Sequence, residues 1–177
     1  MNYQRSDGGI LVPESGIRVG GVFDCELVRG GEIVDRWQDH NLVVNQGLNS
    51  LLDIMFRGAA QIGSWYLGIF EGNYTPVATV TAATISAAST ECTAYAETSR
   101  PAYDEAAAAN QSITNSASRA TFTFNAAKTI YGAFLVSASA KGATTGTLFS
   151  AARFASAKQV EVDDQLLVTY TFNASSL

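Results

Sequence analysis

The sequence has few side chains capable of chemistry. Its 177 residues include one histidine, His40, and two cysteines, Cys25 and Cys92, which lie far apart. None of the three belongs to a metal-ligand motif, a nucleophile motif or a phosphate-binding loop. The sequence therefore predicts no catalytic residue, no cofactor and no metal site. The cysteines are expected to be reduced and partly buried, because nothing indicates that they meet.

Charge is also scarce. Charged residues make up 15% of the chain, where about 25% is usual for a soluble protein. The net charge is −5, and the 11 basic residues are scattered, whereas a nucleic-acid binder needs them clustered. No apolar run approaches the ~18 residues of a membrane span, and the first residues lack a signal-peptide core. We therefore expect no nucleic-acid partner, no membrane partner, and synthesis in the cytoplasm.

The sequence does contain stretches in which apolar and hydroxyl-bearing residues alternate. Residues 119–125 and 166–172 are the clearest cases, and this period of two is typical of strands with one buried face. The stretch 166–172 lies in an expected strand over 165–173, further strands are expected at 19–29, 32–38, 64–70, 91–97, 128–139, 147–154 and 159–162, and the Gly30-Gly31 pair predicts a hairpin turn. About eight to ten strands with short turns favour two packed layers.

The predicted fold is therefore mainly β, a two-layer β-sandwich with jelly-roll or Greek-key connections. Residues 19–177 form one domain, and the polar residues 1–18 form an extended N-terminal arm. One short helix is expected at about 46–57, capped by Asn45 and Gly58. Its apolar stripe should cover an open face or end of the sheet, with a partner-binding face as the alternative. The stripe consists of Leu48, Leu51, Leu52, Met55 and Phe56.

For three segments the sequence does not decide the secondary structure. Residues 77–90 contain no charge and fit a weak strand, a loop or an Ala-rich helix. Residues 104–110 fit one or two helical turns or a loop, and residues 112–116 fit a connector or a short strand.

The remaining candidates for chemistry favour structural explanations. His40 follows a strand and is interpreted as a turn residue. The adjacent acids Asp104-Glu105 and Asp163-Asp164 are too few for a calcium loop, and neighbouring residues usually point apart, unlike glycosidase carboxylates. Asp163-Asp164 is interpreted as a turn. Trp37 and Tyr74 are the exposed aromatic candidates for a carbohydrate site, which the sequence does not favour.

Five longer stretches of the sequence, taken together, resemble those of a known group of proteins. They are Trp37–Leu48 with Asn-Leu-Val-Val-Asn-Gln-Gly-Leu, Trp65–Pro76, Thr90–Arg100, Ser118–Phe124 and Thr129–Leu135. This series resembles a group of small virion structural proteins of tailed bacteriophages. The similarity covers about residues 20–173, whereas residues 1–18 lie outside it.

The resemblance implies a structural role without catalysis. The first expectation is a capsid decoration or cement protein, a homo-oligomer that binds the major capsid protein on the outer face of the head shell. The alternative is a tail-, collar- or fibre-associated structural protein, and a receptor- or carbohydrate-binding module is a third reading. The Ala-, Ser- and Thr-rich segments 77–90 and 104–118 are the expected contact patches.

Overall fold

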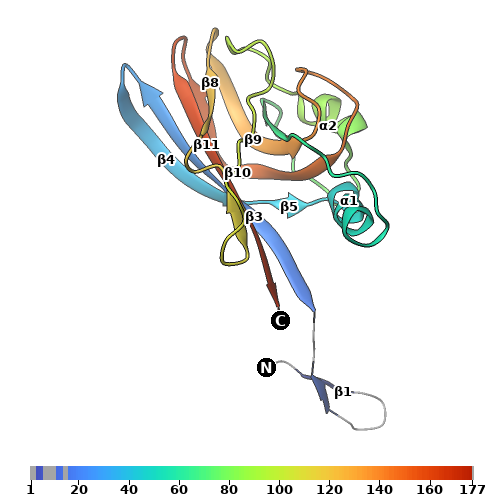
Figure 1. Cartoon of the computed structure of the whole chain (residues 1–177). Helices are drawn as coiled ribbons and strands as arrows, with labels where there is room; N and C mark the ends of the chain where they lie inside the picture. The colour runs from blue at the N-terminus through green and yellow to red at the C-terminus, as the bar shows by residue number, and fades with distance from the viewer. Residues whose placement is uncertain (1–2, 6–10, 14–15, 177) are drawn as a thin grey trace.

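A computed structural model describes residues 3–5, 11–13 and 16–176 of the chain. Two antiparallel sheets pack together (Figure 1), which confirms the predicted β-sandwich. The first sheet has the order β4-β3-β11-β7, with β8 also paired to β11, and the second has the order β5-β10-β9-β6. The first sheet consists of β3 (Ile17–Arg29), β4 (Glu32–His40), β7 (Ser112–Thr114), β8 (Ala120–Thr123) and β11 (Gln165–Ser176). The second consists of β5 (Leu42–Val43), β6 (Tyr66–Phe70), β9 (Lys128–Val136) and β10 (Leu148–Val160).

The first sheet shows the alternation that its sequence predicts. Phe23, Cys25 and Leu27 of β3 are buried, and the acidic residues between them lie on the other face. Gly30 and Gly31 have φ angles of +59° and +87°, which a tight turn between β3 and β4 requires. The predicted hairpin is therefore confirmed.

The second sheet is covered on both faces. Leu67 and Ile69 of β6 belong to the core between the two sheets, whereas Phe70 belongs to a second apolar cluster on the outer face. This double burial explains why the β6 sequence is almost entirely apolar. Strands predicted separately at 147–154 and 159–162 form one strand, β10, with a register irregularity between Arg153 and Lys158.

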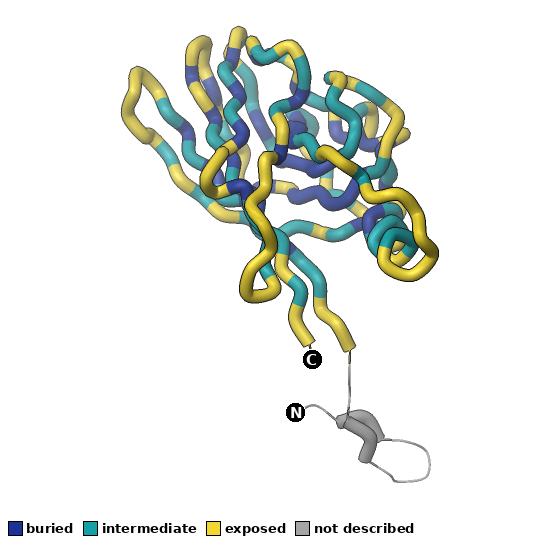
Figure 2. The backbone as a smooth tube through the Cα atoms, viewed as in Figure 1, coloured by how far each residue is buried: buried dark blue, intermediate teal, exposed yellow. Residues whose placement is uncertain are grey.

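One end of the β3–β11 pair projects from the sandwich as a two-stranded stalk, which we define as Ile17–Gly20 and Asn173–Ser176 (Figure 1). Strand β4 pairs with β3 only as far as Val22, and β7 pairs with β11 only as far as Asn173, so beyond these residues β3 and β11 form strand pairs only with each other. Figure 2 shows that the stalk is largely exposed, and Ile17 is 76% exposed. Ile17 and Arg18, which the sequence assigned to the arm, therefore belong to β3.

The rest of the predicted arm is described only in part. Strands β1 (Tyr3–Arg5) and β2 (Leu11–Pro13) pair antiparallel in a sheet of their own, with Arg5 opposite Leu11. Residues 1–2, 6–10 and 14–15 of the arm lie outside the described residues.

Helix α1 (Asn45–Phe56) confirms the predicted helix, but its N-cap differs from the prediction. Val44 takes the N-cap position with an extended backbone, and no side chain caps the helix. At the other end, Gly58 has a φ of +70° and Ala59 N–H donates to the Asp53 carbonyl, as the predicted left-handed cap requires.

The expectation of a single helix is wrong, because residues 82–89 form a second helix, α2 (Ala82–Ser89). Thr81 and Thr84 close a reciprocal capping box at its start, and Thr90 ends it with a left-handed backbone. Of the alternatives for 77–90, the Ala-rich helix is therefore the one observed. Residues 103–108 form a loop, and Ser112–Thr114 form the short strand β7.

The predicted strand at 91–97 is also wrong. Glu91 makes an isolated bridge to Phe70 in the second sheet, and Tyr95 makes one to Phe124 beside the first sheet. The segment crosses from one layer to the other, so it cannot run along either sheet as a strand. Its alternating pattern reflects contacts with two different apolar surfaces.

Candidate functional site

Helix α1 is anchored to the sandwich at its first turn. Gly47 is the only buried residue of the helix, and a Cβ at this position would lie 2.4 Å from the Phe149 carbonyl oxygen of β10. Only glycine allows the helix backbone to approach β10 so closely. The close contact fixes where α1 starts, and the rest of the helix leads away from this point.

The apolar stripe of α1 is largely uncovered. Leu52 is 52% exposed, Met55 67% and Phe56 78%. The expectation that this stripe covers an open part of the sheet is therefore wrong for these three residues, which we call the outer helix stripe. Since the helix leaves the body after Gly47, its last two turns have no layer beneath this face. The alternative interpretation of the stripe, a partner-binding face, thus gains weight.

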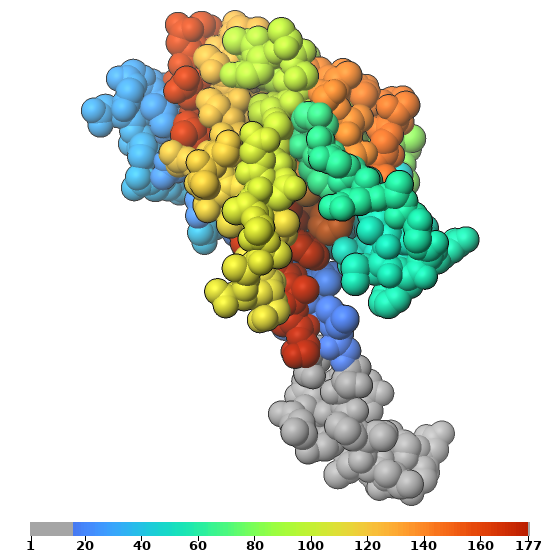
Figure 3. Space-filling model, viewed as in Figure 1, coloured from blue at the N-terminus to red at the C-terminus, as the bar shows by residue number. Residues whose placement is uncertain are grey.

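Beside the outer helix stripe lies an apolar groove with a volume of about 440 Å³. In Figure 3, the teal atoms of α1 and the yellow atoms of the segment before β7 stand apart, with red atoms of β11 between them. Among the described residues that line the groove, Glu105 is the only charged one. The lining consists of Ser50, Leu51, Ile54, Met55, Gln61, Ile62, Trp65, Tyr103, Glu105, Ile113, Leu135, Phe149, Tyr170 and Phe172.

Aromatic rings give the groove a firm floor. The Phe149 ring packs edge-on against Trp65, with centroids 5.6 Å apart, and against Phe172, with centroids 5.0 Å apart. Tyr103 packs in the same way against Tyr170 at 5.7 Å. Edge-to-face pairs of this kind add stability beyond the area they bury. The floor therefore exists before any ligand or partner arrives.

Hydrogen bonds hold the two tyrosines in place. The Tyr170 hydroxyl accepts from Asn41 Nδ2 at 2.7 Å and from Ser150 Oγ at 3.0 Å, and the Tyr103 hydroxyl donates to the Ile113 carbonyl at 3.1 Å. Burial raises the pKa of both tyrosine hydroxyls well above the ordinary value. Both stay protonated over the whole physiological range, so their role in the groove is to shape it.

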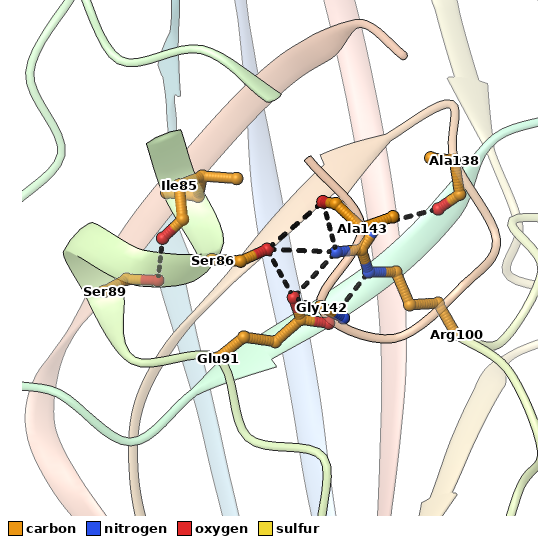
Figure 4. Close-up of polar contacts among 8 residues, drawn as sticks. All are labelled: Ile85, Ser86, Ser89, Glu91, Arg100, Ala138, Gly142 and Ala143. Atoms are coloured by element: carbon orange, nitrogen blue, oxygen red, sulfur yellow. Dashed lines mark hydrogen bonds and ion pairs between the residues drawn. The ribbon is translucent and has the colours of Figure 1, made fainter. Parts of the chain in front are cut away.

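A second polar arrangement lies beside helix α2 and is closed to solvent (Figure 4). Arg100 and Glu91, with side chains 0% and 3% exposed, form a bidentate pair: Arg100 Nη2 lies 2.7 Å from Glu91 Oε2, and Nε donates to Oε1 at 2.8 Å. Ser86 of α2 donates to the same carboxylate at 2.6 Å, and Arg100 Nη1 donates to the Ala138 carbonyl at 2.8 Å. We call these residues the buried clamp.

The buried clamp joins three segments that are distant from one another in the fold. It connects α2, the crossing segment that contains Glu91, and the loop that follows β9, where Gly142 N–H also donates to Glu91 Oε2 at 3.1 Å. Each charge has its partners within the protein, so no part of the pair faces a site open to substrate. The clamp is therefore a structural element. Sequence reasoning missed it, although both residues lie in the Thr90–Arg100 stretch of the resemblance.

The residues singled out from sequence do not gather into one site. His40 is not in a turn but is the exposed last residue of β4. Trp37 of β4 packs edge-on against Phe154, 5.3 Å away, beside the core between the sheets, whereas Tyr74 packs against the outer cluster. Trp37 and Tyr74 therefore form no shared aromatic platform.

The acidic pairs also separate. Asp163-Asp164 forms the predicted turn between β10 and β11, and Asp164 accepts hydrogen bonds from Arg29 Nη2 at 2.6 Å and Nε at 2.8 Å. The hydrogen bond from Arg29 lowers the pKa of Asp164, so this carboxylate stays charged as part of the turn. Asp104 and Glu105 lie in an exposed loop, and Glu105 reaches the groove.

Neither cysteine forms a disulfide, as predicted, but both are fully buried in the same core cluster and not partly buried. Burial is the main reason that the pKa of each thiol is raised, and a protonated thiol is a poor nucleophile. Within the part of the chain that the structure describes, no group of three or more His, Cys, Asp or Glu residues is placed to hold a metal ion.

Among the described residues, no helix is both long and apolar enough to cross a lipid bilayer. In comparisons with known proteins, no family model matches the chain and no curated protein shows significant similarity to it. The resemblance to phage virion proteins therefore stays a prediction, and the outer helix stripe and the apolar groove are the features on which a function can be argued.

Proposed function

We propose that this protein is a structural component of a tailed-bacteriophage virion, a decoration protein that binds the outer face of the head shell through the outer helix stripe. The observation that carries the proposal is the exposure of Leu52, Met55 and Phe56 on a helix anchored to a rigid sandwich. Large apolar side chains that gather on an exposed surface mark sites of protein contact. The resemblance supplies the shell as the partner.

The size of the stripe suits a protein that acts in many copies. Three side chains offer far less than the roughly 800 Å² per partner of a typical stable interface. A weak contact of this kind becomes effective when many copies bind a repeated lattice or when copies are linked to one another. A decoration protein on a shell meets this condition.

The distribution of charge also supports a protein partner. Among the described residues, seven basic side chains form ion pairs with carboxylates of the same chain, so their charge is largely neutralised in place. Binding to packaged DNA would need free basic side chains arranged along one surface. Binding to a protein shell does not require free basic side chains.

The first test is the copy number in purified virions of the phage that encodes the protein. Quantitative mass spectrometry should find it in amounts comparable with the major capsid protein. A few copies per particle would favour the alternative, a tail-, collar- or fibre-associated protein. Its absence from mature particles would refute both proposals.

The second test addresses the surface. Phe56→Asp should lower the affinity for heads that lack the protein by about tenfold or more, because aromatic residues are frequent hot spots of interfaces. Val162→Asp provides a matched control, since Val162 is 55% exposed and lies beside the turn at the opposite end of β11 from the groove. Equal binding by both variants would contradict the assignment of the stripe as the shell contact.

A further inference from the structure

The apolar groove adjoins the outer helix stripe, with which it shares Met55, and it has the properties of a binding site for a partner. Its volume of about 440 Å³ falls in the range of 300–1,000 Å³ that is usual for binding pockets. Its floor is preformed by Trp65, Phe149 and Phe172, and within the described part of the chain no side chain fills it. Filling it would remove a large apolar surface from water.

The position of the groove links it to the stalk. Phe172 in the groove floor pairs with Gly21, directly at the base of the stalk. From Gly21 the stalk carries the chain outward over four residues to Ile17, about 13 Å at the rise of an antiparallel strand. Leu11 lies six residues before Ile17 and can therefore reach roughly 20 Å further. The stalk itself thus leads away from the body of its own copy (Figure 1).

The hairpin contains the apolar segment that suits the groove. Strand β2, Leu11-Val12-Pro13, is extended and, among the described residues, pairs with β1 alone, in a sheet separate from both layers of the sandwich. We infer that β2 of a second copy of this chain occupies the apolar groove, and that two copies exchange their N-terminal hairpins about a two-fold axis. In such an exchange each copy gives one hairpin and receives one, so the assembly closes as a dimer.

The charges of the two surfaces also favour binding of β2 in the apolar groove. Glu105 is the one charged residue in the described lining of the groove, and the exposed Asp104 precedes it. Arg5 lies directly opposite Leu11 in the register of β1 and β2. Residues opposite one another in an antiparallel pair have Cα atoms about 4.5–5.5 Å apart. A β2 strand seated in the groove would therefore bring Arg5 within reach of Glu105.

This inference does not depend on the virion role, because it can be tested with the purified full-length protein. Two single variants are prepared, Val12→Cys and Ile62→Cys, with tags of different size. They are unfolded together, refolded and oxidised, while the native Cys25 and Cys92 stay buried. Because each protein carries one new thiol, a disulfide between positions 12 and 62 can form only between copies. The expected result is a covalent heterodimer on a non-reducing gel, with the link confirmed by mass spectrometry.

A mixture of Val12→Cys with Val162→Cys is the matched control, and it should give no heterodimer. Equal yields in the two mixtures, or no link between positions 12 and 62, would overturn the inference. A double variant carries Val12→Cys and Ile62→Cys in one chain. If its disulfide formed only within a chain, the hairpin would fold back onto the groove of its own copy. That result would also overturn the inference.

The strength of the contact gives a second test. Leu11→Asp should raise the dimer dissociation constant, measured by analytical ultracentrifugation, by about ten- to a hundredfold, because a buried leucine contributes about 1.5–3 kcal/mol. Ser6→Asp adds the same charge elsewhere in the arm and should leave the constant within about twofold of the original protein, as is usual for a surface change. A dimer that is equally stable in both variants, or a protein that is monomeric at all concentrations, would contradict the exchange.

The charge pair can be tested by reversal. Arg5→Glu should weaken the dimer about two- to fivefold, the range of an exposed ion pair, and Arg5→Glu combined with Glu105→Arg should restore it. Failure of the double variant to recover would place Arg5 away from Glu105 and refute the seating of β2. Neither substitution touches Leu52 or Phe56, so a failed exchange and a failed shell contact give different results.

Discussion

The two helices of the sandwich show opposite relations between sequence pattern and packing. Helix α2 consists of alanine, serine, threonine and isoleucine without a distinct apolar stripe, yet its residues Ala82, Ile85 and Ser89 are buried. Helix α1 has a well-defined stripe, yet only Gly47 is buried. The helix with the weaker amphipathic pattern is thus the one that the fold covers more completely.

This difference shows what an apolar stripe can and cannot establish. The stripe tells that a helix face avoids water, but the surrounding chain decides whether that face is covered within the same molecule. For α2 the cover is the outer face of the second sheet, and the buried clamp ties the helix to it. For the outer helix stripe of α1 the described chain supplies no cover, so that surface is available for a partner.

The largest effect should come from breaking the clamp that distinguishes the α2 region. Glu91→Gln removes the carboxylate and leaves the Arg100 guanidinium, 0% exposed, without its counter-charge. Loss of one partner of a buried pair typically costs about 3–5 kcal/mol. Urea denaturation should therefore show a decrease of this size in the free energy of unfolding.

The matched control replaces both charges. Glu91→Met combined with Arg100→Met leaves no buried unpaired charge, so it should recover much of the stability that Glu91→Gln loses. If Glu91→Gln alone lost less than about 1 kcal/mol, well below the range for a broken buried pair, the clamp would not be what secures α2.

A somewhat smaller effect is expected from the apolar contact of α2. Ile85 is fully buried in the outer cluster, and Ile85→Ala should lower the free energy of unfolding by about 2–5 kcal/mol. Ala87→Ser, on the exposed side of the same helix, should change it by no more than about 0.5 kcal/mol. Similar values for the two variants would mean that α2 is not docked as the structure shows.

Much of the sandwich could be predicted because patterns among residues close in sequence determine its strands, its turn and its first helix. The Gly30-Gly31 turn, the period of two in β11 and the stripe of α1 each report on a structure formed by neighbouring residues. Phe122 and Phe124 are buried as their alternation with threonines predicts. In these elements a few adjacent residues contain the whole signal.

The remaining features depend on contacts between distant segments. The sequence does not decide for helix α2, because alanine, serine and threonine differ little in hydropathy and its capping box uses Thr84 in place of the usual glutamate. The segment 91–97 resembles a strand, but it crosses between the layers. The groove combines α1, the loop before β6, the segment around Tyr103 and β11, and no local pattern of any one of them predicts the others.

The smallest effect on stability is expected in the outer helix stripe, and it is the sharpest test of the contrast between the helices. Phe56 is 78% exposed, and serine has nearly the same helix propensity as phenylalanine. Phe56→Ser should therefore change the free energy of unfolding by no more than about 0.5 kcal/mol, whereas Ile85→Ala should lower it by about 2–5 kcal/mol. A loss above about 2 kcal/mol, typical of a buried large side chain, would show that the stripe is covered by its own chain in solution. Such a result would remove the main support for the stripe as a contact surface, because a side chain that stabilises its own fold is not free to bind the shell.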